Sequence, residues 1–197
     1  MRKASAFMVA LLCATRLLAA DHGGSVVSWR GIVGVISAPG IDNPVAVTKD
    51  SNGNVLSQIH SGTLPWVTRS GSAQVDLATG AAQFNVRGLV FIGGNATGTA
   101  GPLNQLVGTL VCNPGSTAVD AAQAIVDTPP VGLSALGNAS FSGELTAPVP
   151  SPCDSPLFLL RIGPAFGAFA GRWVAAGVEP RVGEAFSNGH LDLRDRN

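Results

Sequence analysis

The sequence predicts an all-β domain, an antiparallel sandwich or barrel of about ten strands with an Ig-like or related fold. Apolar side chains stand in many short runs, and several runs alternate with polar residues as in a half-buried sheet. The 25 Gly and 13 Pro separate these runs, as turn formers do. Only 117–126 has the composition of a helix, and its β-branched residues suit a strand as well, so both conformations stay open.

The predicted strands follow one another along the whole chain. The first hairpin is indicated by Asn52-Gly53, a pair typical of two-residue turns in which both residues have positive φ. A second hairpin surrounds Thr79-Gly80, and the chain from Glu179 onward is polar. The predicted strands are 26–36, 45–49, 55–60, 74–77, 82–86, 89–92, 105–112, a run within 131–145, 157–162 and 172–176.

The order of short motifs indicates an internal duplication of the β-domain, with chance recurrence as the alternative. The duplication places Arg87 and Arg161 at matching positions, each after an apolar strand. Each guanidinium either forms a structural ion pair across the sheet or extends into solvent. The first copy has motifs beginning at Pro65, Gly71, Leu77, Phe84 and Gly108, and the second at Pro130, Gly137, Leu145, Phe158 and Gly171.

The N-terminus has the pattern of a secretory signal peptide, predicted at 1–20. Arg2 and Lys3 precede an apolar stretch that is too short to cross a bilayer permanently, and small residues follow. The alternative is a disordered or buried N-terminus. A single β-domain is expected at 21–186 and a polar tail at 187–197, and the location is predicted to be secreted or periplasmic.

Two cysteines remain after such a leader is removed, Cys112 and Cys153. In an oxidising compartment an even pair forms a disulfide most simply, and two buried thiols are the alternative. Closing a loop of this length stabilises a fold by about 4 kcal/mol in the chain-entropy description. Neither Cys has a second metal ligand at a familiar spacing, so no metal site is predicted.

Charge and motifs exclude several classes of partner. Without 1–20 the chain has nine basic and twelve acidic side chains and no basic stripe, which argues against nucleic acid. We predict no cofactor and no integral membrane anchor in the mature chain. The His residues, His22, His60 and His190, lack the spacing of ligands, and Asn95 and Asn138 begin sequons for N-glycosylation, Asn138 within a predicted strand.

Two segments resemble one known family. The segment 128–145, TPPVGLSALGNASFSGEL, resembles the opening of chordin-type (CHRD) domains of secreted proteins, where Pro-Pro-Val leads into a strand with Gly-x-Ala. The segment 64–89 has a similar order of Gly-x-Ala, a turn and a strand ending in Gly-Leu. In that family a His-rich segment follows the Gly-Leu, whereas here Leu89 is followed by VFIGG. The resemblance implies an Ig-like β-fold in an extracellular setting.

No catalytic constellation is recognisable in the sequence, and this favours an exported, non-catalytic module with a structural or binding role. Its partner would be a protein, a glycan or a small apolar ligand. One alternative is a carrier that holds a small apolar molecule in a β-barrel. Another is a secreted hydrolase or isomerase whose site is dispersed over loops.

Overall fold

The computed structural model describes residues 25–38, 41–115 and 124–183. The predicted signal peptide at 1–20 and the tail at 187–197 lie outside these residues. The described chain is mostly antiparallel β-structure, as the sequence predicts. None of its helical segments is long and apolar enough to cross a membrane.

The described residues form thirteen strands rather than about ten, and three of the thirteen have only two residues. In chain order they are β1 (Val26–Gly34), β2 (Val45–Lys49), β3 (Val55–Ile59), β4 (Trp66–Val67), β5 (Ser70–Asp76), β6 (Ala81–Arg87), β7 (Val90–Phe91), β8 (Gln105–Cys112), β9 (Ala124–Asp127), β10 (Val131–Gly132), β11 (Ala139–Glu144), β12 (Leu157–Ile162) and β13 (Trp173–Val182), with the 3₁₀ segment η2 (Pro164–Phe169) before β13.

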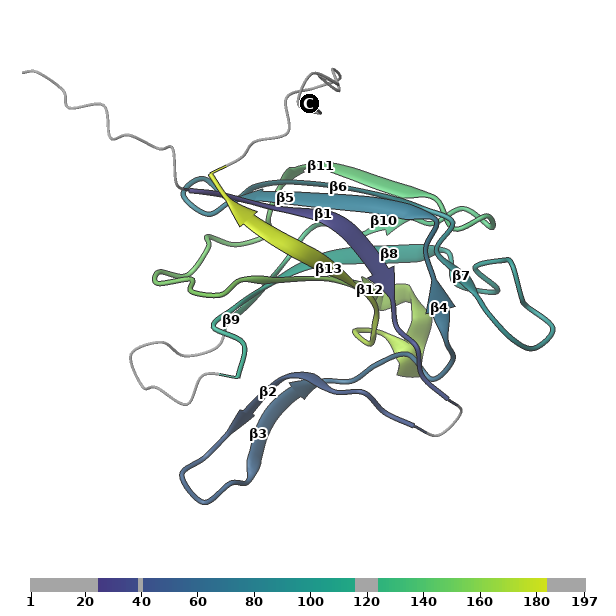
Figure 1. The fold of residues 1–197 in the computed structure, drawn as a ribbon, viewed down its shortest axis with the longest axis horizontal. Coiled ribbons are helices and arrows are strands. Elements are labelled where there is room, and N and C mark those ends of the chain that lie inside the picture. The colour runs from purple at the N-terminus through teal and green to yellow at the C-terminus, as the bar shows by residue number, and fades with distance from the viewer. Residues whose placement is uncertain (1–24, 39–40, 116–123, 184–197) are drawn as a thin grey trace, which may run out of the picture.

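Nine of these strands form one curled antiparallel sheet (Figure 1). Its order is β10-β8-β12-β13-β1-β5-β6-β11, and β9 also pairs with β8. The strands at the two ends of this order, β10 and β11, are consecutive in the chain and also lie near each other in space. The strands β5, β6 and β11 therefore lie opposite β8 and β12 across the core (Figure 1).

The core fills the space inside the curl. In β6 the buried residues Ala82, Phe84 and Val86 alternate with exposed or half-buried polar ones, because successive side chains of a strand point to opposite faces. The ring of Phe158 on β12 lies 5.5 Å from that of Trp29 and 5.9 Å from that of Phe84, measured between ring centroids. Aromatic side chains from β1, β6 and β12 thus meet at the centre of the molecule.

The first hairpin is present, but its predicted two-residue turn is wrong. Only Gly53 has positive φ, and Asp50 and Asn54 close a longer loop by a backbone hydrogen bond of 2.9 Å. The carboxylate of Asp50 accepts bonds from the backbone N–H groups of Asn52 and Asn54, which stabilises this conformation. The second hairpin, between β5 and β6, is confirmed, with Gly80 at φ 78°.

Two further predictions need correction. Strand β13 continues to Val182, beyond the predicted end of the sheet, because its polar C-terminal half pairs with β1 up to Val27. The structure also gives no support to the internal duplication. Strand β5 pairs with β6, whereas their counterparts, β11 and β12, do not pair with each other: β11 pairs with β6, and β12 lies between β8 and β13.

The disulfide between Cys112 and Cys153 is formed, as predicted, with Cα atoms 4.7 Å apart. It ties the end of β8 to the Pro-rich connection before β12. Asn113 supports the same junction, since its side chain donates to the carbonyl of Pro152 and accepts from the backbone N–H of Asp154. A disulfide fits an extracellular location.

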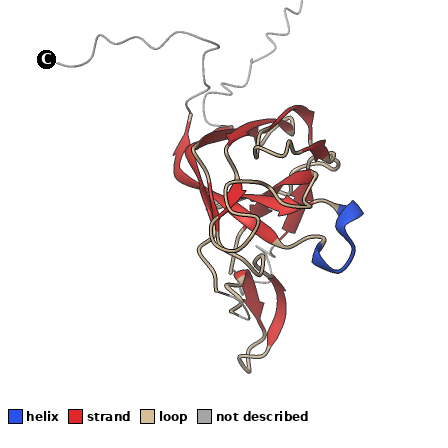
Figure 2. Cartoon of the chain, turned by 90° about the vertical axis from the view of Figure 1, so that its right-hand side faces the viewer, coloured by secondary structure: helices blue, strands red, loops and turns tan. Residues whose placement is uncertain are grey.

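Two smaller sheets extend from the main one (Figure 2). The hairpin of β2 and β3 projects at the bottom of the view, and β4 pairs with β7 near η2, which is the blue segment. Trp66 of β4 and Phe91 of β7 lie opposite each other in this second pair. The pair β4–β7 and the segment η2 form the walls of the site described below.

Replacing Phe158 by Ala tests the aromatic centre of the core. We expect the free energy of unfolding to fall by about 3–5 kcal/mol, because the truncation removes buried surface and leaves a cavity between Trp29 and Phe84. Urea denaturation followed by tryptophan fluorescence measures the loss. The control Leu136→Ala, at a side chain that is 68% exposed, should change stability by less than about 0.5 kcal/mol.

Candidate apolar binding site

A pocket of about 220 Å³ opens between β4, β7 and η2. Its wall consists almost entirely of apolar side chains from segments far apart in the sequence. We call it the apolar pocket and define it by its lining residues, Gly62, Thr63, Leu64, Trp66, Phe91, Ala96, Pro102, Leu103, Ile162, Phe166 and Phe169.

The aromatic back wall is built by the β4–β7 pair. Trp66 and Phe91 are paired across the two strands, and their ring centroids are 3.9 Å apart. Gly101 packs directly on Phe91, since a Cβ at this glycine would come within 2.6 Å of the ring, and its φ of 59° is one that L side chains rarely adopt. The rings are therefore held in place by backbone on one side and by each other.

The loop at 93–104 forms another wall and is held by its own hydrogen bonds. The backbone N–H of Phe91 donates to Thr99, and the N–H of Gly98 donates to Phe91. The hydroxyl groups of Thr97 and Thr99 each donate to a carbonyl three residues earlier, as in local side-chain turns. This loop therefore presents Ala96, Pro102 and Leu103 to the pocket in a defined arrangement.

The mouth of the pocket is formed by η2, which begins at Pro164 and is interrupted at Gly167, where φ is 56°. The rings of Phe166 and Phe169 lie 6.4 Å apart on this segment, and Phe169 is 43% exposed. Leu64, which lines the pocket from the segment just before β4, is 39% exposed. Large apolar side chains at a concave opening are typical of ligand-binding or interaction sites.

Two lining residues have polar side-chain groups, Thr63 with its hydroxyl and Trp66 with its indole N–H. The Nε1 atom of Trp66 lies beside Gly62, another lining residue, at 3.2 Å from the position of a Cβ there. No hydrogen bond from this N–H is found within the described part of the chain, although the indole N–H of Trp173 donates to Asn43 at 2.8 Å. A bound molecule with an oxygen acceptor would satisfy it.

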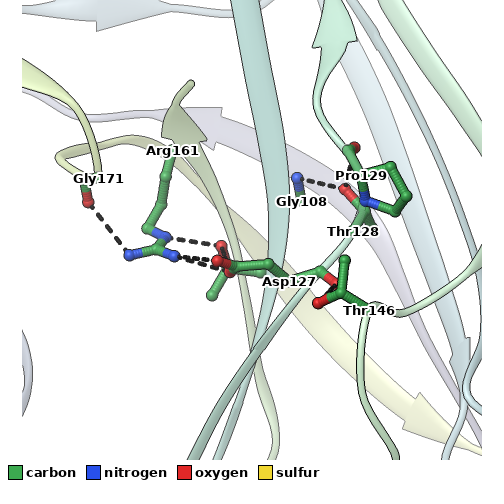
Figure 3. A network of polar contacts seen from close by, with 8 residues as sticks. Gly108, Asp127, Thr128, Pro129, Thr146, Arg161 and Gly171 are labelled. Atoms are coloured by element: carbon green, nitrogen blue, oxygen red, sulfur yellow. Dashed lines mark hydrogen bonds and ion pairs between the residues drawn. The ribbon is translucent and has the colours of Figure 1, made fainter. Parts of the chain in front are cut away.

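The predicted ion pair of Arg161 is present, and Figure 3 shows the network around it. Nη2 of Arg161 donates to both carboxylate oxygens of Asp127 at 2.7 Å, and Nε donates to Thr109 at 2.7 Å. The backbone carbonyl of Asp127 in turn accepts two bonds from Thr146. The network joins β8, β9 and β12 to the segment after β11, and its role is structural.

Arg161 lies on the same face of β12 as Leu159, whose partner on β8 is Thr109, because side chains two positions apart in a strand share a face. A bulge between Leu160 and Arg161 shifts the pairing with β13, so that Arg161 faces Trp173. Arg87 ends β6 in an exposed position, and no ion pair of its side chain occurs among the described residues. The structural ion pair proposed for both arginines is therefore confirmed for Arg161 only.

The asparagines of the two sequons are exposed and lie outside strands. Asn95 is in the loop beside the apolar pocket. Asn138 lies just before β11 rather than within a strand as predicted, because the chain from Ser134 to Asn138 forms a turn closed by backbone hydrogen bonds. Its side-chain oxygen accepts a bond of 3.1 Å from the N–H of Gly88.

No sequence motif indicates a partner for His60, yet the structure pairs its Nδ1 with the carboxylate of Asp42. The other ring nitrogen, Nε2, lies 3.4 Å from the side-chain amide of Gln58. Burial raises the pKa of Asp42, but hydrogen bonds from His60 and Ser61 outweigh this and leave that pKa below its usual value. His22 and His190 lie outside the described residues.

The described residues contain no group of three or more metal-ligating side chains. Comparison with known proteins shows no match to a family model, to a curated protein or to a solved structure. The resemblance to chordin-type domains therefore stays a prediction. The apolar pocket is the feature of the described chain with the geometry of a binding site.

Replacing Asp127 by Asn should lower the free energy of unfolding by about 2 kcal/mol, because it leaves the guanidinium of Arg161, only 16% exposed, without its counter-charge. Urea denaturation measures the change. Arg161→Lys should also destabilise, since an ammonium cannot form the same forked contact. Arg87→Lys is the matched control, and we expect it to change stability by less than about 0.5 kcal/mol. Equal effects at the two arginines would contradict the structural role.

Asp42→Asn tests the pair with His60 through pH. Because the pKa of Asp42 is lower in the folded chain than in the unfolded one, its carboxylate stabilises the fold at neutral pH. This contribution is lost as the pH falls below the ordinary value of about 3.9 and through the folded-state pKa. The difference in unfolding free energy between the natural chain and the variant should therefore shrink in acid, and a difference independent of pH would refute this.

Proposed function

We propose that this protein is an exported, non-catalytic binding module whose apolar pocket takes one small apolar molecule. The pocket itself is the observation that carries the proposal: a concave wall of apolar side chains with partly exposed Phe169 and Leu64 at its mouth. Leaving such side chains in water is unfavourable, and a ligand that covers them gains free energy in proportion to the area buried. Export is supported by the leader-like sequence at 1–20 and by the disulfide.

The size of the pocket limits the ligand. Its volume of about 220 Å³ exceeds that of an engineered apolar cavity that binds benzene, about 150 Å³. It is smaller than the roughly 300–1,000 Å³ typical of sites for drug-sized molecules. A single ring with small substituents, or a short branched chain, fits this range.

The proposed ligand site lies at the rim of the curled sheet and not in its interior. The interior is filled by side chains that include Trp29, Phe84 and Phe158, all of them buried. The pocket instead lies between the small β4–β7 sheet and η2. A ligand there is reached from the surface without opening the core.

The indole N–H of Trp66 refines the ligand class. A ring that carries one oxygen acceptor, such as a ketone, would accept a hydrogen bond from this donor and bury its remaining surface against Phe91 and Leu103. A purely apolar ring would leave the donor unpaired, and the ketone should bind about fivefold more tightly as a result.

Titration with cyclohexanone and with cyclohexane tests the proposal. NMR resonances of the three indole N–H groups report on the site: we expect that of Trp66 to shift with ligand, and those of Trp29 and Trp173 to stay. Trp66→Phe should abolish the preference for the ketone, because it removes the donor.

Leu64→Trp provides the second arm, because a larger side chain at the mouth should fill the pocket and abolish binding of both probes. Leu136→Trp is the matched control, a similar enlargement at an exposed site outside the pocket. Binding that survives Leu64→Trp, or shifts that are equal at all three tryptophans, would refute the proposed site.

A further inference from the structure

The outer face of β5, β6 and β11 carries rows of polar, uncharged side chains. The register places Gln74 opposite Gln83 and Gln83 opposite Ser142, so these three side chains point to the same face. One row further, Ser72 is opposite Asn85, and Asn85 is opposite Ser140. Their neighbours along each strand, such as Ala73 and Phe84, point into the core instead. We call these six residues the polar face, and they are Ser72, Gln74, Gln83, Asn85, Ser140 and Ser142.

Within β5, β6 and β11 themselves, the charged side chains of this face lie at its ends. Asp76 of β5 and Glu144 of β11 lie at one end, and Arg87 of β6 lies at the other. Between them stand only amides and hydroxyl groups, which both donate and accept hydrogen bonds. The middle of the face therefore offers many hydrogen-bonding atoms and no charged side chain of these three strands.

Four of the six residues, Ser72, Asn85, Ser140 and Ser142, have side chains with unused hydrogen-bonding capacity within the described chain. The side chain of Gln83 donates to Gln74 at 3.4 Å, at the long end of the accepted range. No side-chain hydrogen bond of Ser72, Asn85, Ser140 or Ser142 to another described residue is present. These groups are free to bind a ligand that supplies both donors and acceptors.

The polar face is hollowed along its length. Three adjoining depressions of about 420, 210 and 270 Å³ follow β6 from Glu144 to Arg87. The first two share Gln83, and the last two share Asn85 and Ser140. Together they form a shallow track beside a strand of seven residues, about 20 Å in length. A track of this kind suits an extended ligand made of repeated polar units.

We propose that the polar face binds a neutral oligosaccharide chain. Protein interfaces are anchored by aromatic, Met and Arg side chains, and Ser is depleted in them, so the face lacks the composition for a protein partner. Nucleic acid needs rows of Lys and Arg, which the middle of the face does not have. Sugar hydroxyl groups are neutral donors and acceptors, and they match amides and serines along the track. This site is separate from the apolar pocket, with which it shares no residue.

Isothermal titration and NMR with cellohexaose, maltohexaose and chitohexaose test the proposal, with a heparin hexasaccharide as the anionic comparison. We expect at least one neutral hexasaccharide to bind with a dissociation constant near or below about 1 mM, as suits a shallow, solvent-exposed site. Amide resonances of β6 and β11 should shift, and the indole resonance of Trp66 should not. Tighter binding of heparin than of every neutral chain would overturn the proposal.

The double variant Gln83→Ala with Asn85→Ala removes two amides from the centre of the track. We expect binding about thirtyfold weaker, since each amide supplies one ordinary hydrogen bond. Both residues point away from the core, so the melting temperature should be unchanged. The control Gln58→Ala removes an amide from the projecting hairpin and should leave binding unchanged. Absence of binding by all three neutral chains, or binding unaffected by the double variant, would refute the site.

Discussion

Close contact between aromatic rings and glycines sets the geometry of the whole molecule. A Cβ at Gly108 of β8 would come within 2.8 Å of Phe84 and 3.1 Å of Phe158. A Cβ at Gly177 of β13 would likewise come within 2.7 Å of Trp29. Because these positions have no side chain, the three rings approach the backbone of the sheet closely and meet inside its curl. Packing at this density tolerates little change of volume, so the curl and its contents depend on each other.

The curled sheet is secured where its ends approach each other. The guanidinium of Arg161 binds the carboxylate of Asp127, whose carbonyl accepts two bonds from Thr146 (Figure 3). The disulfide of Cys112 and Cys153 ties the same strand, β8, at its end. These contacts connect segments far apart in the sequence, and the disulfide, being covalent, also constrains the unfolded chain. The surfaces outside the curl are therefore free to differ in chemistry.

Two such surfaces have opposite character. The apolar pocket lies where the β4–β7 pair and η2 leave rings and aliphatic side chains partly uncovered. The polar face lies on β5, β6 and β11, where every outward side chain at the centre is an amide or a serine. The first would select a ligand by area and shape, and the second by hydrogen bonds. A module with both could hold a small apolar molecule while attached to a polysaccharide, and each activity can be lost without the other.

The sequence by itself determined the class of the fold, several strands to within a few residues, the disulfide and the presence of candidate partners for Arg161. Alternating runs, turn residues and cysteine number are local signals, and each reflects the chemistry of its own segment. Only the tertiary structure decided which strands are neighbours, that Arg161 is paired and Arg87 is not, and that His60 meets Asp42. The tertiary structure also revealed which residues come together in the apolar pocket and in the polar face. Their residues come from strands and loops far apart in the sequence, and only the tertiary fold, including the register of β5, β6 and β11, brings them together.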